Sequence, residues 1–246
     1  MRRPRGLTAQ IFMEILLVVA AYYSYTIAKN LVHTDPSAEA FRNAWNIVSL
    51  ERTLGIFHEN SLQVWLMEDA RSAVLFLNWV YTLGFWPLLG VTGVFFFVTD
   101  REAYYKYRTV LLVSFGIGVF IFTVYPLAPP RMMGELGFVD TLQLLGPTQH
   151  ISRSEFFSYN MYAAMPSMHF AWALLISMAW ASTSYLWAKV SAIVYQTLMA
   201  AAVVVTGNHY FVDVIVAIPV VMASFYAFQL VLAPSNHTPH EETPPG

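Results

Sequence analysis

The stretch AAMPSMHFAWALL, residues 163–175, sets the problem of the fold, because a proline, a serine and a histidine stand directly before a long apolar run. The apolar run is typical of a membrane helix, since roughly 20 consecutive apolar residues cross the hydrocarbon core. An ionisable side chain at the rim of such a helix is costly unless it has a partner or a function. The stretch therefore predicts a membrane helix whose first turn carries a polar site.

The composition of the whole chain also indicates a membrane protein. Of its 246 residues, 57% are hydrophobic and only 11% are charged, and the mean hydropathy is +0.51. A soluble domain of this length needs more charged residues to cover its surface. The net charge of −2 offers no basic surface to nucleic acid, and the absence of cysteine excludes disulfides, thiol catalysis and cysteine-bound metals.

Six segments are apolar enough for membrane helices, at residues 11–28, 73–98, 109–126, 168–187, 190–206 and 210–232. We therefore expect an all-α protein, a polytopic bundle of six transmembrane helices. The basic N-terminus resembles that of a cleaved signal peptide, but the apolar run is longer than a signal core and lacks a clear cleavage site, which favours a retained helix. We expect one integral-membrane domain over residues 1–236 and a disordered polar tail over residues 237–246.

Residues 37–70 differ from these segments because polar residues interrupt every apolar stretch. Their apolar residues recur at helical spacing, which predicts one or two amphipathic helices in the membrane interface, broken near Gly55. Such helices either pack against the bundle or form a shelf that guides a lipid substrate.

The basic residues beside the predicted helices indicate an orientation. With six helices, one side of the membrane holds Arg2, Arg3, Arg5, Arg101, Lys106, Arg108 and Lys189. This distribution predicts that both termini are cytoplasmic in a plasma or cytoplasmic membrane. The end of the third helix, the start of the fourth and the junction of the fifth and sixth then share the extracytoplasmic face.

The first of three polar clusters on that face is YPLAPPRMM, residues 125–133. Its prolines stiffen the chain and would hold Arg131 in a fixed place. A guanidinium offers a rigid fork of donors that matches phosphate oxygens. An arginine at a membrane rim is also common as a plain interfacial anchor.

The second cluster is MPSMH, residues 165–169. Pro166 fits the start of a helix and Ser167 is a favourable N-cap, so His169 falls in the first turn. Free backbone N–H groups and the helix dipole there favour an anion, and a histidine could give a proton to a leaving oxygen. The alternative is a capped helix with an interfacial histidine.

The third cluster is TGNHYFVDV, residues 206–214. His209 and Asp213 are four residues apart and are expected to share one helix face. Asp213 could fix the imidazole tautomer and leave the other ring nitrogen free to attack. A structural His–Asp pair that caps the helix is the alternative.

The three clusters together indicate a particular chemistry more specifically than any one of them does alone. Two histidines and an aspartate could bind zinc. An arginine beside a cation would be poorly placed, however, whereas Arg131 with His169 and His209 suits an anionic phosphate. The sequence therefore favours a phosphate site without a metal or other cofactor.

The motifs PSMH and HYFVD, with the expected six helices, resemble the type-2 phosphatidic acid phosphatase (PAP2) superfamily over about residues 40–232. The forms P-S-hydrophobic-H, GNHY..D and YP.APPR are most similar to the branch of the inositol phosphorylceramide synthases, which are inositolphosphotransferases. The resemblance implies that His209 is the nucleophile that forms a phosphohistidine, that Asp213 orients it and that His169 is the general acid. It implies that Arg131 and Ser167 bind the phosphate.

The chain departs from the family's lipid phosphatases at one phosphate-binding position. These enzymes usually carry an arginine six residues before the last histidine, where this chain has Val203. Their first motif, with a lysine and an arginine–proline pair, is also not matched. Arg71 and Arg153 are candidates for the missing phosphate ligand, and each could equally be a plain surface charge.

The resemblance implies a membrane-embedded lipid phosphatase or phosphotransferase, with a phosphorylated lipid in the bilayer as substrate. Water as acceptor makes it a hydrolase, and an alcohol such as inositol makes it a transferase. A non-catalytic transporter or scaffold is the alternative of another class, because Glu14 and Asn78 could line a polar path across the membrane.

Overall fold

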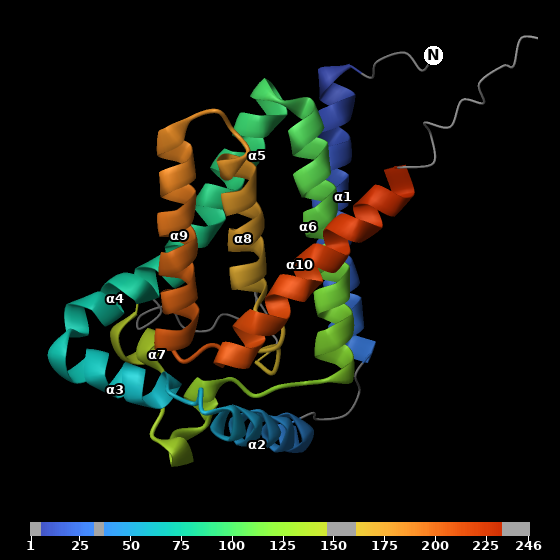
Figure 1. Cartoon of the computed structure of the whole chain (residues 1–246). Helices are drawn as coiled ribbons and strands as arrows, with labels where there is room; N and C mark the ends of the chain where they lie inside the picture. The colour runs from blue at the N-terminus through green and yellow to red at the C-terminus, as the bar shows by residue number, and fades with distance from the viewer. Residues whose placement is uncertain (1–5, 32–36, 147–160, 233–246) are drawn as a thin grey trace, which may run out of the picture.

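The computed structural model of the chain describes residues 6–31, 37–146 and 161–232, and their regular structure is helical (Figure 1). The elements are α1 (Leu7–Leu31), α2 (Ser37–Leu54), α3 (Glu59–Asp69), α4 (Arg71–Trp79), the π-helical turn η1 (Val80–Gly84), α5 (Phe85–Thr99), α6 (Arg101–Val124), the 3₁₀ turns η2 (Pro130–Met132) and η3 (Gly134–Leu136), α7 (Thr141–Leu145), α8 (Met168–Ala181), α9 (Leu186–Val205) and α10 (Phe211–Leu232). Within these ranges the chain forms no β-strand, only an isolated parallel bridge between Leu127 and Ala163. The all-α prediction is confirmed for this part of the chain.

Four helical segments are long and apolar enough to cross a membrane, and they are Arg71–Thr99, Arg101–Val124, Leu186–Val205 and Phe211–Leu230. Two of the six predicted helices have shorter apolar stretches, Thr8–Ser24 in α1 and Met168–Ala181 in α8. The 14 residues of α8 rise about 21 Å, less than the hydrocarbon thickness of about 30 Å. Length and composition therefore support four of the six predicted spans.

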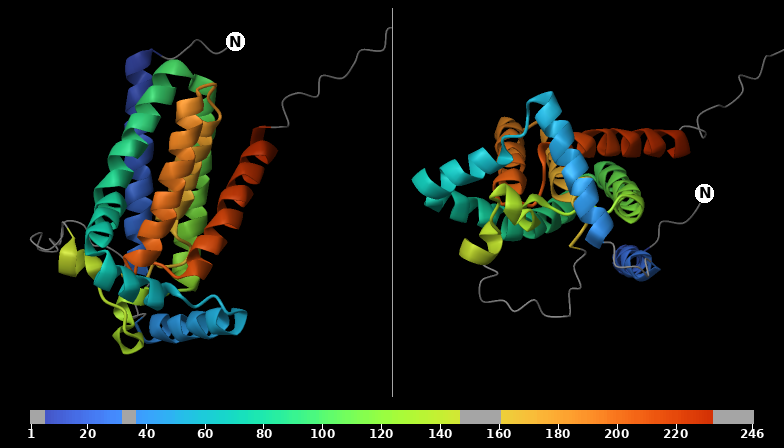
Figure 2. Two further views of the ribbon diagram at one scale, coloured as in Figure 1. Left: turned by 60° about the vertical axis from the view of Figure 1, so that its left-hand side comes forward. Right: turned by 90° about the horizontal axis from the view of Figure 1, so that it is seen from below.

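Helix α8 packs against α5, α6, α9 and α10 and occupies the middle of the bundle (Figures 1 and 2). Its buried residues include Ala171, Ala173 and Ala179, whose small side chains let the neighbouring helices approach closely. The outer helices instead turn large apolar side chains outward, such as Leu186 and Ile193 of α9. The outer surface of these helices is therefore apolar, as expected for a surface in contact with lipid.

Helices α2 and α3 lie across one end of the bundle, crosswise to the long helices (Figure 2). The turn between them contains Gly55, whose φ of 69° lies in the left-handed region that favours glycine. Of the one or two helices predicted here, broken near Gly55, the structure forms two. The buried face of α2 packs on the site-bearing loops, in a cluster that includes Ala40, Ala44, Ile47, Val48, Leu127, Ala128, Met165 and Tyr210. Packing against the bundle is thus one role of this segment.

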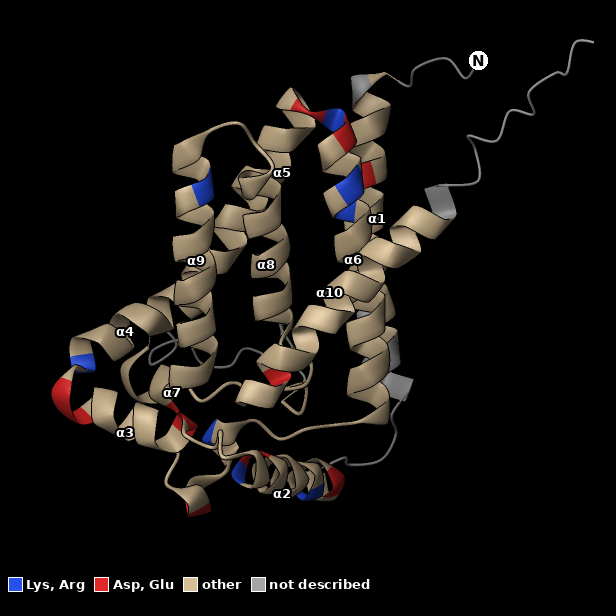
Figure 3. Ribbon diagram, in the orientation of Figure 1, with Lys and Arg blue, Asp and Glu red and all other residues tan. Residues whose placement is uncertain are grey.

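The opposite end of the bundle holds Arg101, Lys106, Arg108 and Lys189, on α6 and α9 (Figure 3). There, Glu14 of α1 forms an ion pair of 2.5 Å with Arg108 and accepts a hydrogen bond of 2.9 Å from the Tyr104 hydroxyl. Glu14 therefore joins α1 to α6.

Asn78 also has a structural partner. It is fully buried in α4, donates to the Thr141 carbonyl at 2.8 Å and accepts from the Thr141 hydroxyl at 2.9 Å. These bonds join α4 to α7. Glu14 and Asn78, the two candidate residues for the polar path of a transporter, therefore both join helices.

Replacement of Asn78 by alanine should lower the thermal unfolding midpoint of the purified protein by several degrees. It leaves buried groups of Thr141 without a hydrogen bond, which costs about 1–3 kcal/mol. Differential scanning fluorimetry in detergent measures the effect, with Asn46→Ala on the exposed face of α2 as the matched control. Equal midpoints for the two variants would contradict the proposed joint between α4 and α7.

Candidate active site

The segments of the first two polar clusters are paired through their backbones. The Leu127 N–H donates to the Tyr162 carbonyl at 2.8 Å, and the Ala164 N–H donates to the Leu127 carbonyl at 3.3 Å. This short parallel bridge places the loop that leads to Arg131 beside the loop that leads into α8.

The third cluster is bonded to both of the others. The Arg131 N–H donates to the Gly207 carbonyl at 2.8 Å, and the Ser167 N–H donates to the Asp213 carbonyl at 3.1 Å. The three clusters, far apart in the sequence, therefore meet at the end of the bundle that α2 and α3 cover (Figure 1).

The buried His209 ring is held through its Nδ1 atom. Nδ1 lies 2.7 Å from the Ala164 carbonyl oxygen and 3.4 Å from Asp213 Oδ2. Because a carbonyl oxygen only accepts, Nδ1 carries the hydrogen and Nε2 keeps its lone pair. The Ala164 carbonyl, in addition to Asp213, therefore fixes the tautomer of the His209 ring.

The protonation state of His209 is set by its surroundings. Burial lowers the pKa of His209 to about 3; the hydrogen bond to Ala164 opposes this change, and the charge of Arg131 adds to it. The imidazole is therefore neutral near pH 7, the state in which a ring nitrogen can attack.

The expectation that His209 and Asp213 share a helix face is wrong, because α10 begins at Phe211 and His209 lies in the turn before it. Asp213 is fully buried and accepts a hydrogen bond of 2.9 Å from the Tyr210 N–H. The aspartate therefore caps the start of α10 while it lies against the imidazole.

His169 is the second residue of α8, in the first turn as predicted. Its ring stacks on Tyr81 at 4.3 Å between centroids and meets Phe85 edge-on at 5.1 Å. Tyr81 comes from the π-helical turn η1, a local distortion that often marks functional positions. The two aromatic rings fix the plane of the imidazole, which is near enough to His209 for their charges to interact.

Ser167 is the N-cap of α8, as predicted, and its Oγ accepts from the Phe170 N–H at 3.4 Å. This cap uses the oxygen as acceptor and leaves the hydroxyl hydrogen to donate. The first N–H groups of α8, at Met168 and His169, have no partner within the helix. The start of α8 therefore presents several donors and a favourable dipole to an anion.

Arg131 lies in η2, directly after Pro129 and Pro130. Its side chain is only 8% exposed; one guanidinium nitrogen donates to the Asn208 side-chain oxygen, and Nε lies 3.7 Å from Asp140 Oδ2. The arginine is thus oriented by groups on both sides, close to His209.

The structure does not bring the remaining phosphate-binding candidates to this site. Arg71 is exposed at the start of α4, at the outer corner beside the acidic end of α3 (Figure 3). Arg153 lies outside the described residues. Val203 is fully buried in the apolar core, and its carbonyl accepts from the N–H groups of Asn208 and His209 at 3.2 and 3.0 Å.

Sequence reasoning missed three residues that shape the site. Asn208 lies inside the third cluster, so its place next to a histidine was a usable signal. Asp140 precedes α7 and caps it by accepting from the Gln143 N–H at 3.0 Å, which is a recognisable N-cap pattern. Tyr81 lies in an apolar run, and no sequence pattern marks it as a residue of the site.

The arrangement can bind and attack a phosphoryl group. It offers one guanidinium, the donors at the start of α8, a neutral imidazole with a free Nε2 and a second imidazole beside it. Among the described residues, no group of three or more His, Asp and Glu side chains is placed to hold a metal ion.

The fold and this cluster define a helical membrane protein with a candidate phosphate site. The chain belongs to the PAP2 superfamily, whose sequence model matches residues 45–227. Members of this superfamily are generally phosphatases or phosphotransferases that act on phosphate esters. Neither the curated proteins nor the solved structures gave a match.

Replacement of Gly207 by alanine should weaken the affinity for orthovanadate, a phosphate mimic, by about tenfold or more. A Cβ at this position, where φ is 71°, would lie 3.1 Å from Gln63 Nε2 and 3.3 Å from Arg131 Cβ. The arginine must then shift, and misplacement by about 1 Å can cost 10²-fold in function.

Gly55→Ala is the matched control for this variant. Gly55 has a similar φ of 69°, but its Cβ would meet no atom within 4 Å. The backbone strain of roughly 1–2 kcal/mol is therefore shared, while the arginine stays in place. Isothermal titration with orthovanadate compares the two, and equal affinities would show that Gly207 does not position Arg131.

Proposed function

We propose that this chain is a membrane-embedded lipid phosphatase or phosphotransferase that works without a metal, through a phosphohistidine on His209. The observation that carries the proposal is the hydrogen bond between His209 Nδ1 and the Ala164 carbonyl, beside Arg131 and His169. It leaves Nε2 as the attacking atom.

In the first step, His209 Nε2 forms a bond to the phosphorus of the lipid, and the bond from phosphorus to the leaving oxygen breaks. His169 gives a proton to that oxygen, so the leaving group departs as a neutral alcohol or acid. The Asp213 carboxylate stabilises the positive charge that develops on the His209 ring.

In the second step, His169 takes a proton from the acceptor, whose oxygen attacks the phosphohistidine and frees His209. Arg131, Ser167 and the first N–H groups of α8 hold the non-bridging oxygens in both steps. The position of these donors at a helix start supports their role, because charge develops on these oxygens in the transition state.

The acceptor decides between the two reactions. Water would release free phosphate, whereas an alcohol would receive the phosphoryl or phospho-head group. The motifs P-S-hydrophobic-H, GNHY..D and YP.APPR favour transfer, with inositol as a candidate alcohol. Incubation with a panel of phosphorylated lipids, with and without inositol, followed by mass spectrometry, separates release from transfer.

We further propose that α1 and α8 cross the membrane with the four longer segments. The basic residues Arg101, Lys106, Arg108 and Lys189 lie at the end of the bundle opposite to the site, which supports a cytoplasmic position for that end and an extracytoplasmic site. Substrate would then reach the site from the outer leaflet.

His209→Ala should abolish turnover of the phosphorylated lipid, because no other side chain takes the place of Nε2. His169→Ala should lower kcat by about 10²–10⁴ fold for an alkoxide leaving group and less for a good leaving group that needs no proton. His58→Ala, at an exposed histidine before α3, is the matched control and should leave kcat unchanged. Turnover by His209→Ala at the wild-type rate would show that the nucleophile is misassigned.

Orthovanadate should inhibit competitively with the lipid, and EDTA should leave the rate unchanged, because the oxyanion is held by side chains and backbone donors. Initial-rate measurements with each compound test this expectation. Inhibition by EDTA that added zinc reverses would establish a metal site instead. If no phosphorylated lipid in the panel is turned over, a transporter or scaffold becomes the better interpretation.

A further inference from the structure

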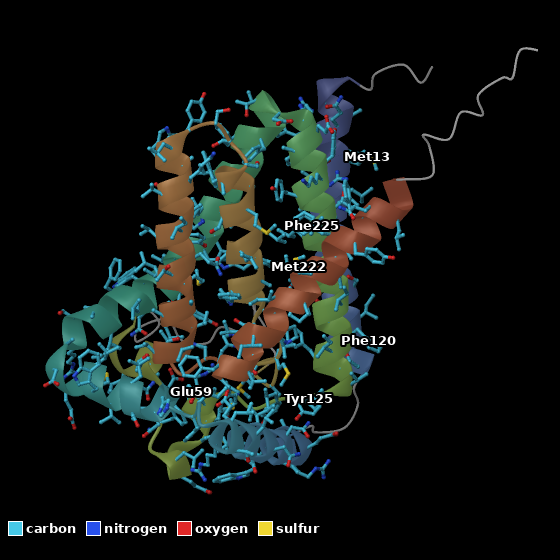
Figure 4. The ribbon with its side chains drawn as sticks, in the orientation of Figure 1. Met13, Glu59, Phe120, Tyr125, Met222 and Phe225 are labelled. Atoms are coloured by element: carbon cyan, nitrogen blue, oxygen red, sulfur yellow. The ribbon has the colours of Figure 1, made fainter. Side chains whose placement is uncertain are left out.

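Two buried glutamates lie beneath the candidate site, and the mechanism above does not use them. Glu51 is in the last turn of α2, and Glu59, which is labelled in Figure 4, begins α3 on the other side of the turn at Gly55. Both side chains are fully buried. A buried carboxylate is costly unless hydrogen bonds or a proton compensate it. Their burial therefore requires a physical explanation.

Each glutamate accepts a backbone hydrogen bond from the first turn of α10. Glu59 Oε1 accepts from the Phe211 N–H at 2.9 Å, and Glu51 Oε1 accepts from the Val212 N–H at 2.8 Å. Asp213 accepts from the Tyr210 N–H. Three successive N–H groups at the start of α10 thus end on three carboxyl groups, two of which come from outside the helix.

The second carboxyl oxygens of the two glutamates, Oε2 in each, have no hydrogen-bond partner in the described part of the chain. Burial, together with the neighbouring Glu59 side chain, raises the pKa of Glu51, so this carboxyl group keeps its proton near pH 7. Two adjacent carboxylates in a buried place do not both ionise readily. The pair therefore holds one proton near pH 7, on Glu51.

We infer that Glu51 and Glu59 are a positioning pair, which ties α2 and α3 to the first turn of α10 through their bonds to the Val212 and Phe211 N–H groups, shares one proton, and so holds His209 and Asp213 against Arg131 and His169. In its catalytic part, this inference rests on the function proposed above.

The geometry gives the pair a direct path to the nucleophile. Phe211 and Val212 follow His209 in the chain, and Asp213 comes directly after them. A shift of the first turn of α10 therefore moves the imidazole and its carboxylate together, while Arg131 and His169 belong to other segments.

The shared proton makes the arrangement sensitive to alkaline pH. Burial first, and then the hydrogen bond and charge of Glu59 and the charge of Asp213, raise the pKa of Glu51 from 4.5 to about 9, against the opposing Val212 N–H. The Tyr210 phenol also faces the three carboxyl groups. Because this pKa is raised on folding, the stabilisation is complete below about pH 4.5 and is lost as the pH rises through about 9.

The variant Glu51→Gln distinguishes a positioning role of Glu51 that depends on the shared proton from a purely structural role of this residue. Its amide oxygen can accept from the Val212 N–H, and its NH₂ group can donate to Glu59 without a titrating proton. For the wild type we expect kcat to fall about tenfold between pH 8 and pH 10, as one proton with a pKa near 9 is lost. In Glu51→Gln this fall should disappear, with kcat at pH 7 within about threefold of wild type and KM unchanged.

Glu59→Gln should behave in the same way, because its amide can accept from the Phe211 N–H and donate to Glu51. Glu68→Gln, at an exposed glutamate of α3, is the matched control and should keep the alkaline fall of the wild type. Glu51→Leu removes the acceptor of the Val212 N–H and the carboxyl group that holds the proton, and kcat should drop more than tenfold at every pH. Parallel pH profiles of kcat for wild type and Glu51→Gln would overturn the inference.

A second readout keeps this test separate from the test of the proposed function. The thermal unfolding midpoint of the wild type should fall between about pH 5 and pH 9, and that of Glu51→Gln should fall less. If the wild type turns over no phosphorylated lipid, the proposed function and the catalytic part of the inference fail, and the midpoints decide whether the shared proton exists. Unfolding midpoints that fall equally in both proteins would then also overturn the inference of a shared proton.

Discussion

The structure depends on how the chain satisfies the backbone donors at the start of α10. Three N–H groups there are buried or partly buried in an apolar membrane protein, where an unpaired donor costs free energy comparable to a lost hydrogen bond. Glu59, Glu51 and Asp213 supply the acceptors. Because Glu51 belongs to α2 and Glu59 belongs to α3, the same hydrogen bonds also hold these two crosswise helices against the end of the bundle.

The same constraint explains why the chemistry-bearing residues converge. The turn before α10 carries His209, and its backbone is bonded to the segments of the other two clusters. Each cluster therefore serves as part of the framework for the next. The guanidinium, the two imidazoles and the start of α8 lie at the same end of the bundle because these backbone bonds hold their segments together.

Parts of this account could be predicted from the sequence, because they depend on local patterns. The apolar runs indicated the four long spans, glycine at position 55 indicated the break between α2 and α3, and Ser167 indicated the start of α8. The family follows from motifs that are short and local. The roles of Arg131, His169, His209 and Asp213 remain predictions of those motifs, supported by their proximity.

Other features could not be predicted, because they depend on contacts between distant residues. Glu51 bonds a residue 161 positions away, and in the sequence it is one polar residue of an amphipathic helix. The stacking of Tyr81 on His169 likewise follows from packing in three dimensions. The central claim is that His209 is the nucleophile, and it is tested most directly by locating the phosphoryl group on the protein. The His169→Ala protein is incubated with a phosphorylated lipid that has a good leaving group. The reaction is then quenched at alkaline pH, and the phosphorylated residue is identified by mass spectrometry. The account predicts phosphate on His209, and phosphate on any other residue would contradict it.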